Sequence, residues 1–317
     1  MISLRSYVKM LRPDYWTKHI FILPGIMLAI LYVGDVNILL VLKNAGLGVA
    51  VACLAASSNY VINEFLDREF DKFHPIKKQR VNVTTNIPVR NIVILYLSLL
   101  LLSYFVSYFF INKFFFLVIV FFTLMGLVYN VPPVRTKDIF ILDILTESIN
   151  NPIRLILGWA MVSPFSIPPS SLILFYFFTG CFLMTSKRLS EYAEMDRMGS
   201  LEQLKLYRGA FRKYNRQNLM DLMSFFYGTS IFLLTVFMFK YKIEFLFILP
   251  FFILMFVYYS KLSLASSNVS LNSVSFHKDK VIKRLLFIIF LLFIVLYYVN
   301  LPKLEEFFSS KAILFFK

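Results

Sequence analysis

Three oxygen-bearing side chains recur at every fourth position where a long apolar segment ends. Residues 47–62 carry no charge, and Asn63, Asp67 and Asp71 then follow at i, i+4 and i+8. On a helix this spacing places the three side chains on one face over two turns. An acid at the centre of a bilayer costs about 2.5–3.5 kcal/mol, so repeated acids near its boundary need a compensating partner. Mg²⁺ is such a partner, because it takes oxygen ligands and shares carboxylates with substrate phosphates.

Basic side chains follow this acidic stripe at once. His74, Lys77 and Arg80 all lie within nine residues of Asp71. An ordinary solvated helix end with surface charges is the alternative interpretation. The order of acids and then cations favours a ligand that carries phosphate groups together with a metal ion.

A second group of polar residues surrounds a Pro-Pro turn. Tyr129 comes three residues before Pro132, and consecutive prolines end the apolar segment that precedes them. Arg135 and Lys137 follow the turn and are expected to face the same aqueous boundary as the acidic stripe. They are candidate ligands for phosphate.

Ionisable residues also lie inside the next apolar segment. Asp143 and Glu147 are spaced i, i+4, and with Arg154 they fall close to one helical face. Ionisable residues within a membrane are candidates for function. The alternative is an internal ion pair between Glu147 and Arg154 that fixes helix packing, and the sequence leaves both interpretations open.

A third group is Lys187, Arg188 and Glu191, which are expected to share one face of a helix. Two cations beside one acid suit a phosphate-rich ligand. The alternative is a set of positive charges that anchors the end of a membrane span.

The composition is that of a membrane protein with many spans. Of the 317 residues, 59% are hydrophobic and only 16% are charged, whereas a soluble domain has about 25% charged residues. The net charge of +15 does not indicate nucleic-acid binding, because its distribution follows the expected membrane topology. We therefore expect an all-α, polytopic membrane helical bundle, formed by residues 1–317 as a single domain among membrane lipids.

Nine segments are long enough to cross a bilayer, which takes about 17–25 apolar residues. The first follows basic residues but lacks a convincing cleavage site, so it is expected to be retained rather than removed as a signal peptide. The nine predicted spans are 18–33, 44–66, 90–111, 114–131, 139–161, 171–190, 217–239, 243–260 and 282–300.

The distribution of basic residues orients these spans. One side of the predicted topology carries 25 lysines and arginines and the other carries 7. Because cytoplasmic loops hold the excess of basic residues, we expect the N-terminus inside and the C-terminus outside. Residues 260–280 are expected to form a flexible inside loop, and the tail 301–317 a short interfacial helix.

The Asn63-xxx-Asp67-xxx-Asp71 pattern resembles the first aspartate-rich motif of the UbiA superfamily of intramembrane prenyltransferases. The resemblance implies about nine transmembrane helices, a diphosphate held through Mg²⁺, and a site open to the cytoplasmic side. The segment from Tyr129 to Lys137 is similar to the family's Pro-Pro loop. The second Asp-xxx-Asp motif of most members is missing, because Glu191 is followed at that spacing by Met195.

Further residues resemble one branch, the decaprenyl-phosphate phosphoribosyltransferases. They are His74-Pro75-x-Lys77-x-x-Arg80, the Lys187-Arg188-x-x-Glu191 element and the N-terminal Leu-Arg-Pro followed by Trp-x-Lys. The chain departs from the branch at Val81, where a proline is usual. This resemblance implies a prokaryotic cytoplasmic membrane and transfer of phosphoribosyl from phosphoribosyl diphosphate to a polyprenyl phosphate.

The resemblance also implies residue roles. Asn63, Asp67 and Asp71 would hold the metal, and Asp67, Asp71 and Lys187 would be catalytic. The implied substrate-binding residues are Asn63, Lys77, Arg80, Tyr129, Arg135, Lys137, Asp143, Arg188 and Glu191. The alternative activity is prenyl transfer from an isoprenoid diphosphate to an aromatic or other small acceptor, and a third hypothesis is a transporter or an inactive scaffold.

Overall fold

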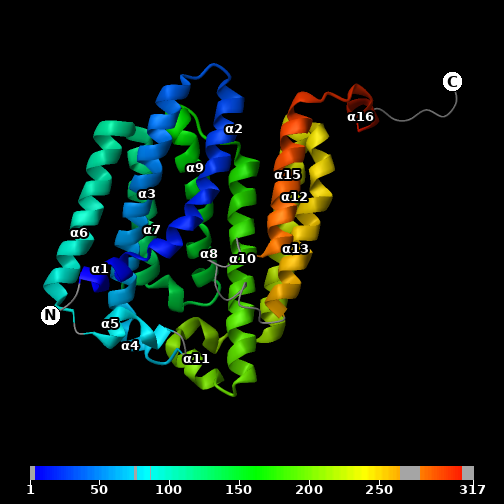
Figure 1. Ribbon diagram of the computed structural model, residues 1–317. Coiled ribbons are helices and arrows are strands. Elements are labelled where there is room, and N and C mark those ends of the chain that lie inside the picture. Colours follow the sequence, from blue (N-terminus) through cyan, green and yellow to red (C-terminus); the bar gives the residue numbers. More distant parts are fainter. Residues whose placement is uncertain (1–3, 75–76, 86, 265–278, 309–317) are drawn as a thin grey trace.

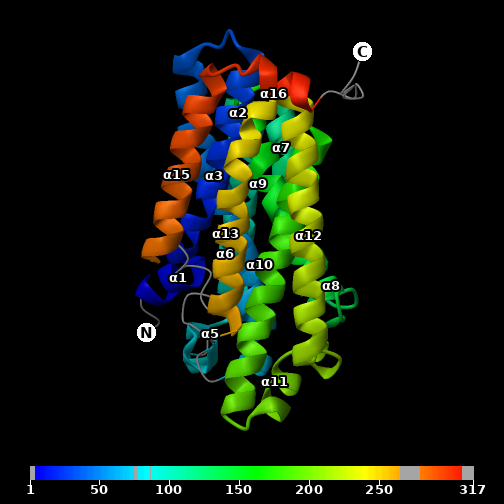
Figure 2. The same cartoon turned by 90° about the vertical axis from the view of Figure 1, so that its right-hand side faces the viewer.

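Long helices form a bundle, and the short helices α4 (Arg68–Asp71), α5 (Val81–Thr84) and α11 (Leu201–Tyr207) lie near one end of it (Figures 1 and 2). The computed structural model describes residues 4–74, 77–85, 87–264 and 279–308, and no strand occurs in these ranges. The long helices are α2 (Leu23–Val33), α3 (Ile38–Leu66), α6 (Val89–Val106), α7 (Lys113–Asn130), α9 (Asn150–Val162), α10 (Ser170–Arg197), α12 (Arg216–Tyr241), α13 (Leu249–Leu264) and α15 (Lys280–Tyr298).

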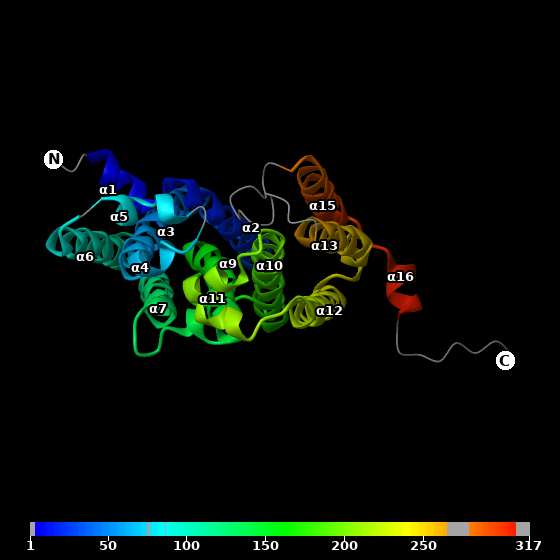
Figure 3. The same cartoon turned by 90° about the horizontal axis from the view of Figure 1, so that it is seen from below.

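Eight helical segments in the described part of the chain are long and apolar enough to cross a membrane. They coincide with eight of the nine predicted spans, which confirms the all-α membrane fold. Seen from below, α6 lies at one side of the bundle and α12, α13 and α15 lie at the other (Figure 3). Between them stand α3, α7, α9 and α10, which carry the residues of interest.

The predicted fifth span, 139–161, consists of two helices. These are α8 (Leu142–Ser148) and α9, which meet at Ile149. Pro152 has no N–H to give to the carbonyl of Ser148, and the side chain of Asn151 donates to that carbonyl instead at 3.2 Å. Ile149 keeps helical dihedrals, φ −56° and ψ −28°, so both helices continue along one path.

The predicted first span has a more complex start than its hydropathy indicates. The amphipathic helix α1 (Leu4–Leu11) lies roughly across the bundle axis (Figures 1 and 2). Arg12 then adopts a left-handed conformation at φ 50°, and the 3-10 helix η1 (Pro13–Ile22) leads into α2. The turn at Arg12 directs η1 back into the bundle, where it contacts α3 and α9.

Asparagine side chains fix where several spans begin. Asn37 accepts a hydrogen bond from the backbone of Leu40 at the start of α3, 3.1 Å long, which places that start earlier than the predicted residue 44. Asn112 accepts from Phe115 at the start of α7, at 2.7 Å. Each side chain satisfies a backbone donor that the first helical turn leaves unpaired.

The charge-rich segments predicted to share one side lie near one end of the bundle. α4 (Arg68–Asp71), α5 (Val81–Thr84) and α11 (Leu201–Tyr207) are at the lower end in Figure 1, and α16 (Pro302–Phe307) is at the upper end. Other short elements are the 3-10 helices η2 (Lys77–Gln79), η4 (Thr136–Asp138), η5 (Gly209–Arg212) and η6 (Ile243–Ile248), and the π-helix η3 (Ser107–Ile111).

Two predicted features of the C-terminal third fall partly outside the described residues. Residues 265–278 of the predicted inside loop are not described. The predicted tail helix is present at α16, and residues 309–317 are not described. Its position at a membrane interface stays a prediction.

Helices α2 and α9 approach each other closely through two glycines. A Cβ added at Gly158 would lie 2.1 Å from the backbone oxygen of Ile22, and one at Gly25 would lie 2.2 Å from that of Leu155. Because the obstructing atoms belong to the backbone, they cannot move aside as a flexible side chain can.

We expect Gly158→Val to destabilise the protein by about 1–3 kcal/mol or more, the usual cost of overpacking a tight contact. Thermal unfolding of the purified protein in detergent measures the change. The matched control is Gly46→Ala, since a Cβ at Gly46 meets no atom within 4 Å. An unchanged midpoint for Gly158→Val would contradict the close packing of α2 and α9.

Candidate active site

The acidic stripe lies where α3 ends and α4 begins. The backbone N–H of Asp67 donates to Asn63 at 2.9 Å, and that of Asp71 donates to Asp67 at 2.8 Å. The i, i+4 spacing predicted for the three residues is therefore present in the backbone. Asp67 is 4% exposed and Asp71 is fully buried, which excludes an ordinary solvated helix end.

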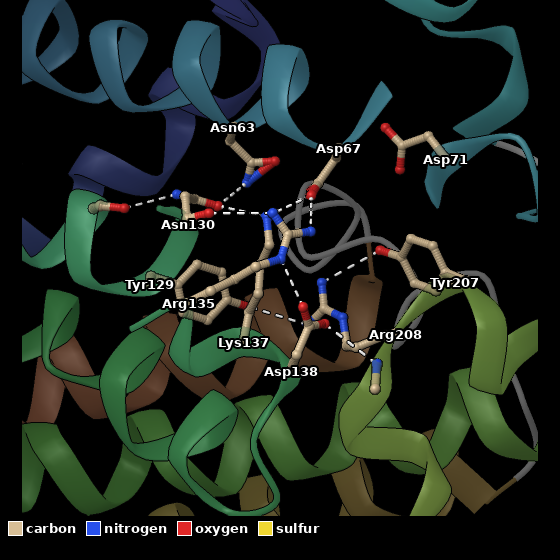
Figure 4. A network of polar contacts seen from close by, with 12 residues as sticks. Asn63, Asp67, Asp71, Tyr129, Asn130, Arg135, Lys137, Asp138, Tyr207 and Arg208 are labelled. Carbon is tan, nitrogen blue, oxygen red and sulfur yellow. Dashed lines mark hydrogen bonds and ion pairs between the residues drawn. The ribbon is translucent and has the colours of Figure 1, made fainter. Parts of the chain in front are cut away.

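Asp67 is held by two cations from the loop after α7. Arg135 donates to its Oδ1 at 2.9 Å, and Lys137 forms a short hydrogen bond with the same oxygen. Figure 4 shows both cations reaching Asp67 from the opposite side of the site. The side chains of Asp67 and Lys137 are 6% and 2% exposed, so this ion pair is buried.

Asn130 connects this cluster to Asn63. Its Oδ1 accepts hydrogen bonds from Lys137 and from the amide nitrogen of Asn63, each 2.9 Å long. The amide nitrogen of Asn63 is therefore engaged, and its carbonyl oxygen is turned toward Asp67 (Figure 4). This orientation presents an amide oxygen beside a carboxylate, which is the kind of donor set that Mg²⁺ prefers.

Asp71 binds Arg80 through a short ion pair. Nearby, the His74 ring packs edge-on against Tyr207 of α11, with centroids 4.8 Å apart. The backbone of Lys77 lies in η2, but its side chain is outside the described part of the structure. The segment after the stripe therefore ties α11 to the end of α3.

A second buried cluster surrounds Arg188 of α10. Its guanidinium donates to Asp143 at 2.8 Å and to Glu191 at 2.7 Å, and Tyr214 donates to Asp143 at 2.6 Å. Arg188 is 1% exposed. The predicted proximity of Arg188 and Glu191 is present, but Lys187 does not join this cluster. Lys187 and Arg188 nevertheless line the same cavity, which is described below.

Asp143, Glu147 and Arg154 do not all come together, because Glu147 and Arg154 line the cavity described below and Asp143 does not. Asp143 turns to Arg188, whereas Arg154 donates to the backbone oxygen of Asn150 at 3.0 Å. No Glu147–Arg154 ion pair is present among the described residues, so the alternative of a packing ion pair is not supported either.

A cavity of about 120 Å³ lies between the two clusters, and we call it the polar cavity. It is bordered by seven basic residues and by two acidic ones, Asp67 and Glu147. The basic residues are Arg12, Lys18, Arg80, Arg154, Lys187, Arg188 and Arg208. This excess of positive charge suits a ligand with more than one anionic group.

The predicted site residues divide into those that border the polar cavity and those behind them. Asn63, Asp67, Arg80, Tyr129, Lys187 and Arg188 border it. The others with described side chains do not: Asp71, Arg135, Lys137, Asp143 and Glu191 bind the residues that do, or pair with one another. Asp143 and Glu191 pair with Arg188, and their direct contact with a ligand stays a prediction.

Several residues at the polar cavity were not predicted as site residues. Arg12 and Lys18 come from the N-terminal segment, where only the motif resemblance drew attention to them. Tyr207 ends α11 and Arg208 follows it, in a segment that the sequence marks only by its positive charge. Arg208 donates to the hydroxyl of Tyr129 at 3.0 Å. The two residues are 79 positions apart in the sequence, so no local sequence pattern predicts their contact.

Burial changes the proton affinity of two groups beside the cavity and outside the spans. It lowers the pKa of Lys137, and the carboxylate of Asp67 opposes that shift by favouring the charged amine. Burial raises the pKa of Tyr207 well above its ordinary value, and the nearby carboxylates of Glu191 and Asp67 act in the same direction. Tyr207 therefore stays a neutral phenol.

A larger cavity of about 780 Å³ adjoins the polar one, and we call it the apolar cavity. Its walls are mostly aliphatic and aromatic side chains from η1, α2, α10, α12, α13 and α15. Five residues border both cavities: Lys18, Glu147, Arg154, Met184 and Lys187. The molecule thus joins a cationic site to an apolar compartment.

The fold is that of an integral membrane protein in which a cavity lined by cations adjoins an apolar cavity. The model of the UbiA prenyltransferase family matches residues 20–278. The chain therefore belongs to the UbiA prenyltransferase family and is a membrane-embedded transferase. No curated protein matches the chain.

Solved structures share this fold. A UbiA homologue from Archaeoglobus fulgidus bound to GPP and Mg²⁺ has a TM-score of 0.67 and 20% identity, over 95% of this chain and 99% of that one. The same homologue bound to DMAPP and Mg²⁺ has a TM-score of 0.67 and 21% identity, over 93% and 100%. A structure of digeranylgeranylglyceryl phosphate synthase has a TM-score of 0.61 and 18% identity, over 92% and 97%.

The ion pairs around Asp67 predict a stability effect that is independent of activity. Asp67→Asn leaves Lys137 buried without a carboxylate and leaves Arg135 with Asp138 alone, and breaking a buried pair in this way costs about 3–5 kcal/mol. Asp138→Asn is the matched control. It removes a carboxylate partner of Arg135, and the side chain of this aspartate is 29% exposed. A partly exposed ion pair of this kind contributes at most about 1 kcal/mol to the free energy of unfolding.

Thermal unfolding without substrate or added metal compares the two variants. We expect Asp67→Asn to unfold at a clearly lower temperature than Asp138→Asn. If Asp67→Asn unfolds at the wild-type temperature or above it, the buried cations Arg135 and Lys137 do not need the carboxylate of Asp67 for the stability of the fold, and the prediction is wrong.

Proposed function

We propose that this protein is a Mg²⁺-dependent transferase that moves phosphoribosyl from phosphoribosyl diphosphate to a polyprenyl phosphate and releases diphosphate. The observation that carries the proposal is the polar cavity, where seven cations face two acids beside an apolar compartment. Both proposed substrates are phosphate-rich, and one has a long apolar chain. A site with this excess of positive charge suits two anionic substrates better than one.

The residues at the end of α3 fit Mg²⁺. Asn63 and Asp67 supply oxygen atoms on one side, and no group of three His, Cys, Asp or Glu suited to a metal occurs among the described residues. A Mg²⁺ ion held by one or two protein oxygens takes its other ligands from substrate phosphates and water. When bound, the ion would neutralise charge that develops on the departing diphosphate. We further propose that Asp71 joins the metal when Arg80 turns from it to a donor phosphate.

The bond changes in this transfer balance without a general base. An oxygen of the lipid phosphate forms a bond to C1 of the ribose, and the bond from C1 to the diphosphate oxygen breaks. The diphosphate leaves with that electron pair. The acceptor phosphate is already ionised, so no proton has to be removed before attack. Arg80, Lys187 and Arg188 border the cavity and would stabilise the charge on the phosphates.

The residues behind the cavity keep these groups in place. Arg135 and Lys137 fix the carboxylate of Asp67, and Asp143 and Glu191 fix the guanidinium of Arg188. We propose that they position the binding groups and do not contact the ligand. The excess of basic residues at this end of the bundle supports the proposal that the site faces the cytoplasm.

A second candidate is transfer of an isoprenoid from its diphosphate to a small acceptor. It is favoured by the UbiA homologue structures that contain GPP or DMAPP with Mg²⁺ and share the fold of this chain. Both candidates place a diphosphate at Asn63 and Asp67. They differ in the carbon to which that diphosphate is attached.

A donor panel distinguishes the two activities. The purified protein with Mg²⁺ and undecaprenyl phosphate is given radiolabelled phosphoribosyl diphosphate, and in parallel labelled geranyl or geranylgeranyl diphosphate with aromatic acceptors. We expect label from phosphoribosyl diphosphate in the lipid fraction, with a mass that adds one phosphoribosyl group. Product from an isoprenoid diphosphate, with none from phosphoribosyl diphosphate, would refute the proposed donor.

The metal proposal predicts how activity responds to Mg²⁺. We expect EDTA to stop transfer and added Mg²⁺ to restore it. Asp67→Asn should lower kcat by about 10²–10³-fold, the effect of losing one important electrostatic group. The control is Asp221→Asn on α12, an exposed carboxylate bound only to Gln217 in the described structure. Full activity of Asp67→Asn in EDTA would exclude a metal held at this residue.

A further inference from the structure

The boundary between the polar and apolar cavities carries three cations and one acid. Lys18 comes from η1, Glu147 from α8, Arg154 from α9 and Lys187 from α10, and all four border both cavities. We call these four residues the junction. Four separate elements therefore place charged groups where the apolar compartment meets the cationic one.

Arg154 is the most informative residue of the junction. It is 7% exposed, and its Nε has no hydrogen-bond partner among the described residues. Its guanidinium donates to the backbone of Asn150 at 3.0 Å and lies 5.8 Å from the centre of the Phe122 ring. A charged group buried in this way is costly unless a charged or polar partner meets it.

The other cations of the junction also lack a carboxylate partner in the described structure. Lys18 lies 4.7 Å from the centre of the Tyr15 ring, and no ion pair of Lys18 or Lys187 occurs among the described residues. By contrast, Arg12, Arg80 and Arg188 each pair with an acid. The one acid of the junction, Glu147, leaves a net positive charge there.

We propose that the junction binds the phosphate group of the polyprenyl phosphate, whose chain occupies the apolar cavity. The inference rests on the proposed function and deepens it, because it assigns the two anionic substrates to different parts of the site. The donor diphosphate lies at Asn63 and Asp67. The lipid phosphate lies at Lys18, Arg154 and Lys187, with its first isoprene units against the adjoining apolar wall.

The geometry also gives a reason for the acid in the junction. Glu147 accepts a long hydrogen bond from Asn150, 3.5 Å between the heavy atoms. The carboxylate of Glu147 offsets one of the three positive charges of the junction. The net positive charge that remains is one that a single phosphate group can balance. An uncharged polyprenol would fill the apolar cavity and leave the cations without a counter-charge.

Lipid binding without the donor tests this assignment. The full-length protein in detergent is mixed with undecaprenyl phosphate, undecaprenol or dioleoyl phosphatidic acid, and bound lipid is measured by native mass spectrometry. The variants are Lys18→Gln, Lys187→Gln and Arg154→Gln, with Arg154→Lys to keep the charge if Arg154→Gln unfolds. Lys43→Gln is the matched control, because Lys43 is exposed and borders neither cavity.

We expect the wild-type protein to bind undecaprenyl phosphate in preference to both other lipids. Each Gln variant should bind undecaprenyl phosphate about tenfold more weakly, as expected for one lost charged hydrogen bond, while its binding of undecaprenol is unchanged. Arg154→Lys should lose less than Arg154→Gln, and Lys43→Gln should match the wild type.

Two results would overturn the assignment. One is equal binding of undecaprenyl phosphate by the Gln variants and the control. The other is a preference for phosphatidic acid, which would assign the junction to an ordinary phospholipid headgroup. The lipid-binding assay contains no phosphoribosyl diphosphate, so it tests the junction independently of the proposed transfer. If the donor panel shows no phosphoribosyl transfer, the lipid-binding result still stands. If the variants do not change lipid binding, the result of the donor panel still stands.

Discussion

The contact of Asp67 with Arg135 and Lys137 is the interaction on which the rest of the site depends. It connects the end of α3 to the loop after α7, across 68 and 70 positions of sequence. A carboxylate at this depth needs compensating charge, and the two cations supply it. Through Asn130, the same contact sets the orientation of Asn63. One ion-pair cluster therefore fixes both oxygen donors that face the polar cavity.

The opposite wall has its own buried cluster around Arg188, which Tyr129 connects to Arg208. The hydroxyl of Tyr129 lies 3.4 Å from a nitrogen of Arg188 and 3.0 Å from one of Arg208. Arg208 also lies 3.3 Å from the hydroxyl of Tyr207, whose α11 contacts α4. The loop after α10 thus closes the lower end of the cavity against the end of α3. Binding groups held in this way need little rearrangement when a ligand arrives.

Local spacing predicted which residues lie close together over one or two helical turns. The four-residue spacing of Asn63, Asp67 and Asp71 and the proximity of Arg188 to Glu191 follow from helical geometry alone, and hydropathy located the spans. Arg154 could be noticed only as an ionisable residue in an apolar segment. Its place in the junction depends on how α9 packs against η1 and α10. Likewise, nothing near Lys137 in the sequence indicates Asp67 as its partner, because that contact exists only after the bundle forms.

The central claim is that a metal-bound diphosphate occupies the polar cavity at Asn63 and Asp67. A crystal structure with Mn²⁺ in place of Mg²⁺ and phosphoribosyl diphosphate tests it most directly, since anomalous scattering locates the metal. The account predicts one strong peak at coordination distance, about 2.0–2.3 Å, from oxygen atoms of Asn63 and Asp67 and from the diphosphate. A metal peak elsewhere, or a diphosphate bound without contact to Asp67, would contradict it.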